Sequence, residues 1–96
     1  VIVGNDAAWG IEQHFQRALY SPDRLVGTSL RRSRYDLMVE ALGGHGEFVE
    51  HPKELRPALE RAFASGKPAC VNVAVQHTPS PMTQAFTRFL LRRRGA

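Results

Sequence analysis

The sequence predicts an α/β fold in which helices cover both faces of a parallel sheet, as a three-layer sandwich. Two apolar runs, residues 1–3 and 69–75, are typical of strands buried on both faces. Between them, apolar residues recur at helical spacing, and glycine or proline follows each helical stretch. Strands that alternate with helices favour parallel pairing through right-handed crossovers.

The first half of the chain is predicted to hold one strand and two helices. The strand ends at Gly4, and a polar turn leads into a helix over about residues 9–20. A Ser-Pro-Asp sequence ends that helix, and the polar stretch after it predicts a loop as far as residue 33. Apolar spacing predicts a second helix over 35–42, which Gly43 and Gly44 end. The apolar face of the first helix is expected to contain Ile11, Phe15, Ala18 and Leu19.

The second half is predicted to hold two strands and two helices. A short strand over 47–50 precedes a third helix, whose apolar stripe runs from Leu55 to Phe63. Pro57 conflicts with a regular helix, so we expect that helix to begin late or to be distorted at its start. After the strand over 69–75, a proline-containing linker leads to a short helix that ends in arginines.

These elements predict an incomplete α/β half-domain over residues 1–77, and a linker with a basic C-terminal helix or tail over 78–96. The chain begins inside an apolar run and has no initiator methionine, so we expect it to be the back portion of a larger protein. A chain of this size buries only about 60% of its unfolded surface, and we expect the remainder of the parent chain to complete its core.

Composition narrows the possible partners. The 43% hydrophobic content is ordinary for a globular protein, and no apolar run approaches the roughly 18 residues of a membrane span. The net charge of +4 comes largely from residues 31–34 and 92–94, which lack the interleaved aromatics of nucleic-acid-binding surfaces. We therefore expect no membrane and no nucleic-acid partner. Cys70 lies in an apolar run, which predicts a buried structural thiol and fits a cytoplasmic location.

The turn between Gly4 and Gly10 is the candidate functional site. Ligands of parallel sheets bind beyond the carboxyl ends of the strands. Here small residues admit close backbone approach, Asp6 adds a carboxylate, and the amides of the next helix favour a phosphate. A carboxylate beside a phosphate suits Mg²⁺. From the residues alone a second interpretation stays open, in which Asn5 and Asp6 only cap the helix.

The turn resembles the second half of the cofactor motif of thiamine diphosphate-dependent enzymes. In that motif Gly-Asp-Gly is followed about two dozen residues later by a strand ending in Asn-Asn, and here the strand ends in Asn5-Asp6. The chain is most similar to the C-terminal end of acetolactate synthase-like proteins, a group close to 2-hydroxyacyl-CoA lyases, oxalyl-CoA decarboxylases and benzoylformate decarboxylases. The similar segments are residues 9–12, 34–36, 41–44, 52–59 and 66–73.

The resemblance implies the C-terminal half of a thiamine diphosphate-binding domain, with thiamine diphosphate and Mg²⁺ as cofactors. Asp6 would give a side-chain oxygen to Mg²⁺, and the backbone carbonyl of Ala8 would be the next metal ligand. The family has Asn at position 6, so Asp6 adds a negative charge there. The positions at or next to the diphosphate are Asn5, which shapes the turn, Ala8, Trp9, Gly10 and Ile11.

The implied parent is an acetolactate synthase-like carboligase or decarboxylase of 2-oxo acids, assembled as a homodimer or homotetramer. Glu12 is the candidate catalytic residue, because related decarboxylases carry a glutamate at this place; an acidic residue is also favoured there by the helix dipole alone. One alternative is a 2-hydroxyacyl-CoA lyase or oxalyl-CoA decarboxylase with an acyl-CoA substrate. Another is a non-catalytic α/β interaction fragment with a basic tail. The segment by itself is expected to be inactive.

Overall fold

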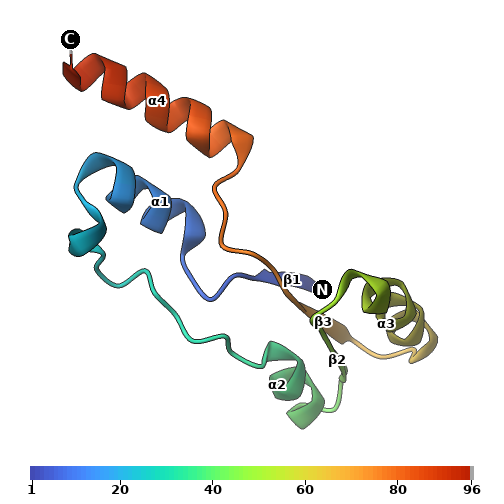
Figure 1. Cartoon of the computed structure of the whole chain (residues 1–96). Coiled ribbons are helices and arrows are strands. Elements are labelled where there is room, and N and C mark those ends of the chain that lie inside the picture. Colours follow the sequence, from blue (N-terminus) through green and yellow to red (C-terminus); the bar gives the residue numbers. More distant parts are fainter. Residues whose placement is uncertain (96) are drawn as a thin grey trace. The chain divides into compact units, whose positions relative to one another are not determined.

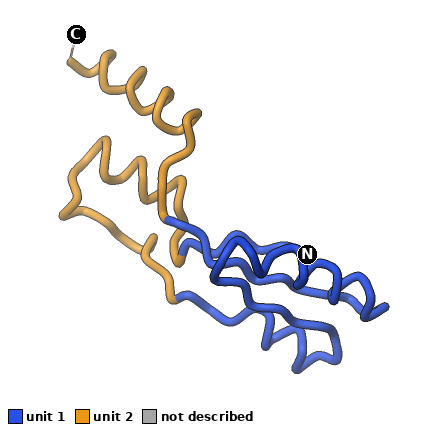
Figure 2. Tube along the Cα trace, turned by 45° about the vertical axis from the view of Figure 1, so that its right-hand side comes forward, with its two compact units in different colours: residues 1–6, 32–76 blue, residues 7–31, 77–96 orange. Residues whose placement is uncertain are grey.

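The computed structural model describes residues 1–95, which form two compact units (Figures 1 and 2). The sheet unit comprises residues 1–6 and 32–76, drawn blue in Figure 2. The helical unit comprises residues 7–31 and the described part of the chain from residue 77 onward. The division between 1–77 and 78–96 stays a prediction.

The sheet unit contains three parallel strands, β1 (Ile2–Asn5), β2 (His45–Val49) and β3 (Ala69–Ala74). Their order is β1-β3-β2, with Ile2 opposite Val71 and His45 opposite Ala69. The central strand β3 is therefore the one enclosed on both sides. Among the described residues β1 lies at an edge, and Ile2 is 61% exposed. The prediction of a strand buried on both faces is confirmed for β3, in which three successive residues, 70–72, are buried. For β1 it stays a prediction, because the remainder of the parent chain is expected to complete this part of the core.

Helices α2 (Tyr35–Ala41) and α3 (Pro52–Ala64) cover opposite faces of this sheet (Figure 1). Val71 of β3 packs in the core with Ala58 of α3. Its neighbour Asn72 donates a hydrogen bond to Asp36 of α2. Since successive side chains of a strand point to opposite faces, the two helices lie on opposite sides. The predicted α/β class with a covered parallel sheet is confirmed.

The start of α3 corrects one expectation. The helix begins at Pro52 and continues through Pro57, so it does not begin late. Pro52 is tolerated in the first turn, where its missing amide has no helical partner. The carboxylate of Glu54 also accepts hydrogen bonds from the amides of Glu50 and His51, at 3.1 and 3.2 Å. These contacts and the burial of Ala58 outweigh the single helical hydrogen bond that Pro57 removes.

The two faces of the sheet differ in polarity. The α3 side holds the apolar core, made of Val49, Ala58, Ala62 and Val71, with Leu55, Leu59, Ala69 and Val73 packed against it. The opposite side carries polar groups, described below. Cys70 is buried and free, and burial raises the pKa of its thiol. The prediction of a buried structural cysteine is confirmed.

The helical unit contains α1 (Gly10–Leu19), the short 3₁₀ helix η1 (Pro22–Arg24) and α4 (Pro81–Gly95). The rings of Phe15 and Phe86 join α1 to α4 edge to face, with centroids 5.6 Å apart. Ser80 caps α4, since its hydroxyl accepts the amide of Thr83 at 3.1 Å, and Pro81 takes the first helical position.

Helix α4 is longer than predicted. It has 15 residues and includes the three arginines, which were expected to form only its end. Arginine is a good helix former. Two of these side chains also have partners, because Arg93 stacks on Phe89 and Arg94 donates to the carbonyl of Leu19 at 3.0 Å. None of the described helices is both long and apolar enough to span a bilayer.

Candidate cofactor site after the first strand

The candidate turn is divided between the two units. Asn5 and Asp6 belong to the sheet unit, and Ala7 opens the helical unit.

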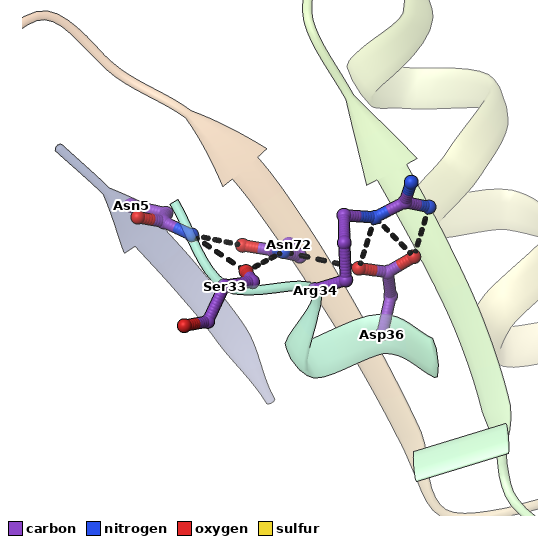
Figure 3. Close-up of polar contacts among 5 residues, drawn as sticks. All are labelled: Asn5, Ser33, Arg34, Asp36 and Asn72. Carbon is purple, nitrogen blue, oxygen red and sulfur yellow. Dashed lines mark hydrogen bonds and ion pairs between the residues drawn. The ribbon is translucent and has the colours of Figure 1, made fainter. Parts of the chain in front are cut away.

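Asn5 ends β1 inside a buried polar network (Figure 3). Its side-chain amide donates to the carbonyl of Ser33 at 3.0 Å and to Oδ1 of Asn72 at 3.1 Å. The amide of Asn72 in turn donates to the Ser33 carbonyl and to Oδ1 of Asp36, both at 3.0 Å. Asn72 is fully buried. Buried amides need such partners, so the network fixes the orientation of Asn5 at the end of the strand.

Asp36 is the charged member of this network. Its side chain is 3% exposed, and its carboxylate accepts a forked pair of hydrogen bonds from the guanidinium of Arg34 (Figure 3). The Arg34 hydrogen bonds, helped by Asn72, hold the pKa of Asp36 below its usual range, against the opposing effect of burial. The guanidinium of Arg34 also lies 4.3 Å from the ring centroid of Phe48.

The backbone carbonyl of Asn5 is held as well. It accepts the guanidinium of Arg32 at 2.7 Å and the amide of Val75 at 3.1 Å. Together with the side-chain contacts, these bonds position the peptide that leads directly to Asp6. Asp6 is partly buried, and it lies at the carboxyl end of β1 because it directly follows Asn5, as the sequence predicts.

In the helical unit, the backbone turns sharply at Ala7, whose φ is +58°. This left-handed conformation is uncommon for a residue with a side chain. A short antiparallel bridge between Ala8 and Ser29 follows. Its two hydrogen bonds run from the amide of Leu30 to the carbonyl of Ala7, at 2.8 Å, and from the amide of Trp9 to the carbonyl of Thr28, at 2.9 Å. The backbone on both sides of Ala8 is thereby fixed.

Two glutamines of α1 hold the loop that forms this bridge. Gln13 is buried and donates to the hydroxyls of Thr28 and Ser29. Gln16 accepts the Thr28 hydroxyl at 2.7 Å and donates to the carbonyl of Val26. The sequence assigned this face of the helix no role and placed Ile11 on the apolar face, whereas Ile11 is 62% exposed.

The N-terminus of α1 leaves both interpretations of the turn open. The N-cap residue is Trp9, whose side chain makes no capping hydrogen bond. The interpretation of Asn5 and Asp6 as caps of α1 stays a prediction beside that of a ligand site. Trp9, Ile11 and Glu12 are all exposed on the first turn. For Glu12 this means that the described residues do not supply the desolvation that a general acid or base needs.

The donor set fits Mg²⁺ in type but not in number. A carboxylate oxygen of Asp6 and a carbonyl oxygen of Ala8 are hard ligands of the kind that Mg²⁺ prefers. Residues 1–95 contain no cluster of three or more His, Cys, Asp or Glu side chains that could hold a metal. The roles of the individual site residues stay predictions.

Sequence analysis missed the polar network and the glutamine pair. A signal for the network was present, because Asn72 interrupts an otherwise apolar strand and a buried amide must find partners. Arg34 and Asp36 were noticed only through the resemblance. Which residues Asn72 would meet depends on strand order and crossover, and the sequence alone does not contain that information.

In α/β folds with a parallel sheet, ligands bind beyond the carboxyl ends of the strands, where this chain has its polar turn. Residues 1–73 match the family described as thiamine pyrophosphate enzyme, C-terminal TPP binding domain. The chain belongs to this family.

Two kinds of relative agree with the match. Over 72 residues the chain is 57% identical to the acetolactate synthase large subunit of Mycobacterium tuberculosis. This aligned segment covers 75% of the chain and 13% of that protein. Over 78 residues the chain is 32% identical to a 2-hydroxyacyl-CoA lyase of Arabidopsis thaliana, and this segment covers 78% of the chain and 14% of that protein. The chain thus spans about one seventh of the length of these relatives.

Proposed function

We propose that this chain is part of a thiamine diphosphate- and Mg²⁺-dependent enzyme that acts on 2-oxo acids, in the manner of an acetolactate synthase. We call that enzyme the full-length protein. The observation that carries the proposal is the 57% identity to an acetolactate synthase large subunit across a segment of 72 residues. The end of β1 also supports the proposal, because hydrogen bonds of the Asn5 side chain and backbone carbonyl hold the residue directly before Asp6 in place.

In this proposal, Asp6 and the carbonyl of Ala8 ligate Mg²⁺. The first-turn amides of Gly10 and Ile11 face the negative charge of the diphosphate at the positive end of the helix dipole. The exposed ring of Trp9 supplies apolar surface beside it and excludes water. When bound, thiamine diphosphate supplies a nucleophilic carbon and an electron sink for decarboxylation. Asn5 holds the turn in shape through Ser33 and Asn72.

The alternative is a 2-hydroxyacyl-CoA lyase, which the 32% identity to the plant enzyme supports. The two activities differ in substrate. Purified full-length protein should therefore be assayed for CO₂ release from pyruvate and, separately, for cleavage of a 2-hydroxyacyl-CoA. Activity on the CoA thioester alone would favour the alternative.

Calorimetric titration tests the cofactor site. Thiamine diphosphate should bind the full-length protein tightly with Mg²⁺ and weakly without it. Asp6→Ala should weaken binding in the presence of Mg²⁺ by about tenfold or more, since a ligand beside a polyanion is lost. Asp23→Ala is the matched control, because it removes the same charge from the exposed helix η1. Equal affinity of wild type and Asp6→Ala would remove Asp6 from the site.

A further inference from the structure

The helical unit contains a hollow of about 700 Å³ lined by residues of α1, α4 and the segment that leads into α4. This volume is in the range of small-molecule sites. Two arginines line it, Arg17 from α1 and Arg88 from α4. No carboxylate of residues 1–95 lines it.

Neither arginine is neutralised by a residue that the structure describes. In residues 1–95, Arg17 and Arg88 form no hydrogen bond and no ion pair, whereas Arg34, Arg56 and Arg61 of the sheet unit each pair with a carboxylate. The helical unit as a whole carries seven arginines and only two acidic residues, Glu12 and Asp23. Two guanidinium groups facing one hollow without counter-charges form a site for an anion.

The remainder of the lining is flat or apolar. The rings of His14 and His77 stack with centroids 4.4 Å apart and an angle of 18° between their planes. Ala18 and Pro79 add apolar surface. Such a wall suits an organic body better than it suits an inorganic ion.

The walls of the hollow are held together independently of any ligand. The Phe15–Phe86 contact joins α1 to α4, and the Ser80 cap fixes the start of α4. The buried hydroxyl of Thr83, which also lines the hollow, lies 3.0 Å from that of Ser80. The hollow is therefore preorganised within this unit, so its walls need little ordering when a ligand binds.

We propose that this hollow binds a phosphate-bearing small molecule with an organic body, at a site separate from the proposed cofactor turn. Arg17 and Arg88 take the phosphate, and the His14–His77 pair with Ala18 and Pro79 contacts the organic body. A phosphate is favoured over a carboxylate because its second negative charge matches the second guanidinium. This inference does not depend on the proposed 2-oxo acid chemistry.

The test uses full-length protein saturated with thiamine diphosphate and Mg²⁺, so that the cofactor turn cannot take up the probe. ADP is titrated calorimetrically at low ionic strength, with inorganic phosphate, adenosine and benzoate as comparison probes. ADP should bind at least tenfold more tightly than inorganic phosphate, and adenosine and benzoate should bind still more weakly. Benzoate binding as tight as that of ADP would overturn the phosphate assignment.

Variants locate the site. Arg17→Gln with Arg88→Gln should weaken ADP binding at least tenfold. Arg24→Gln with Arg31→Gln is the matched control, because it removes two positive charges from the same unit outside the lining and should change affinity less than twofold. Ala18→Phe fills the hollow without a change of charge and should also weaken binding. Equal loss in the control pair, unaltered binding in the lining variants or no ADP binding to wild type would each overturn the proposal. Thiamine diphosphate affinity, measured on the same samples, reports separately on the cofactor site.

Discussion

Two guanidinium nitrogens of Arg34 donate hydrogen bonds to the buried carboxylate of Asp36, Nη2 to Oδ2 at 2.7 Å and Nε to Oδ1 at 3.0 Å. The two residues are only two positions apart, at the start of α2. Through Asn72, this pair is connected to the side chain of Asn5 and so to the end of β1 (Figure 3). The carboxylate of Asp36 on α2 thus helps to orient the end of β1, which directly precedes the candidate metal ligand Asp6.

This connection predicts a pH dependence of stability. The pKa of Asp36 is lowered in the folded protein, chiefly by Arg34. Ionised Asp36 therefore contributes fully to the free energy of unfolding above its unfolded-state pKa of about 4. This contribution is lost as the pH falls through the lower, folded-state pKa. Asp36→Asn should reduce the free energy of unfolding at pH 7 by about 1–3 kcal/mol and flatten the acid limb of the stability profile.

Urea unfolding of the full-length protein between pH 3 and pH 7 measures this effect. Glu60→Gln is the control, since Glu60 pairs with Arg56 on the exposed face of α3 and such pairs contribute little. If Asp36→Asn and wild type lose stability in parallel on acidification, Asp36 does not cause the acid limb.

At Gly46, strand β2 packs so closely against α2 that a larger side chain should destabilise the protein. A Cβ atom at this position would lie 2.3 Å from the backbone oxygen of Asp36, so Gly46→Ala would push α2 away from the sheet. We expect a loss of about 1–3 kcal/mol, or several degrees in Tm. Gly4→Ala is the matched control on β1, where the nearest atoms are side-chain carbons of Val75 at 3.9 Å. Equal Tm values for the two variants would contradict the packing seen here.

At Ala7, substitution by glycine should not lower the free energy of unfolding. Its φ of +58° is unfavourable for alanine and open to glycine. Ala7→Gly should therefore leave the free energy of unfolding unchanged or raise it by up to about 1 kcal/mol, while Ala7→Val should lower it by about 1–3 kcal/mol.

The comparison variant is Ala85→Gly, on the exposed face of α4, where glycine should cost about 1 kcal/mol. Thermal unfolding of the three variants gives the order. A loss at Ala7→Gly as large as that at Ala85→Gly would mean that the left-handed turn is absent in solution.

Glu12 carries a prediction about catalysis. If its carboxylate transfers a proton in the full-length enzyme, Glu12→Gln should lower kcat by about 10² to 10⁴ and leave thiamine diphosphate affinity nearly unchanged. Steady-state kinetics with pyruvate, together with cofactor titration, separates the two effects. A decrease of kcat smaller than about threefold would identify Glu12 as a charge that only favours the helix dipole.

Local sequence patterns determined much of the fold. Apolar spacing predicted the helices over 35–42 and 55–63, and the glycine pair Gly43-Gly44 correctly predicted the end of α2. Gly43 there has a φ of +91°, and its amide and that of Gly44 bond back to the last turn. These features depend on neighbours within a few residues, which is why a single sequence reveals them. The resemblance in turn identified the family, which the match over residues 1–73 confirms.

What the sequence by itself determined was therefore the α/β class, most elements and the polar turn after β1. Only the tertiary structure decided that β3 is the central strand, that Asn72 joins Asn5 to Asp36, and that Gln13 rather than Ile11 is buried on α1. The physical reason is that strand order and helix facing depend on contacts between residues far apart in the chain. Asn5 and Asn72 are 67 positions apart, and no local propensity records that they share a hydrogen bond.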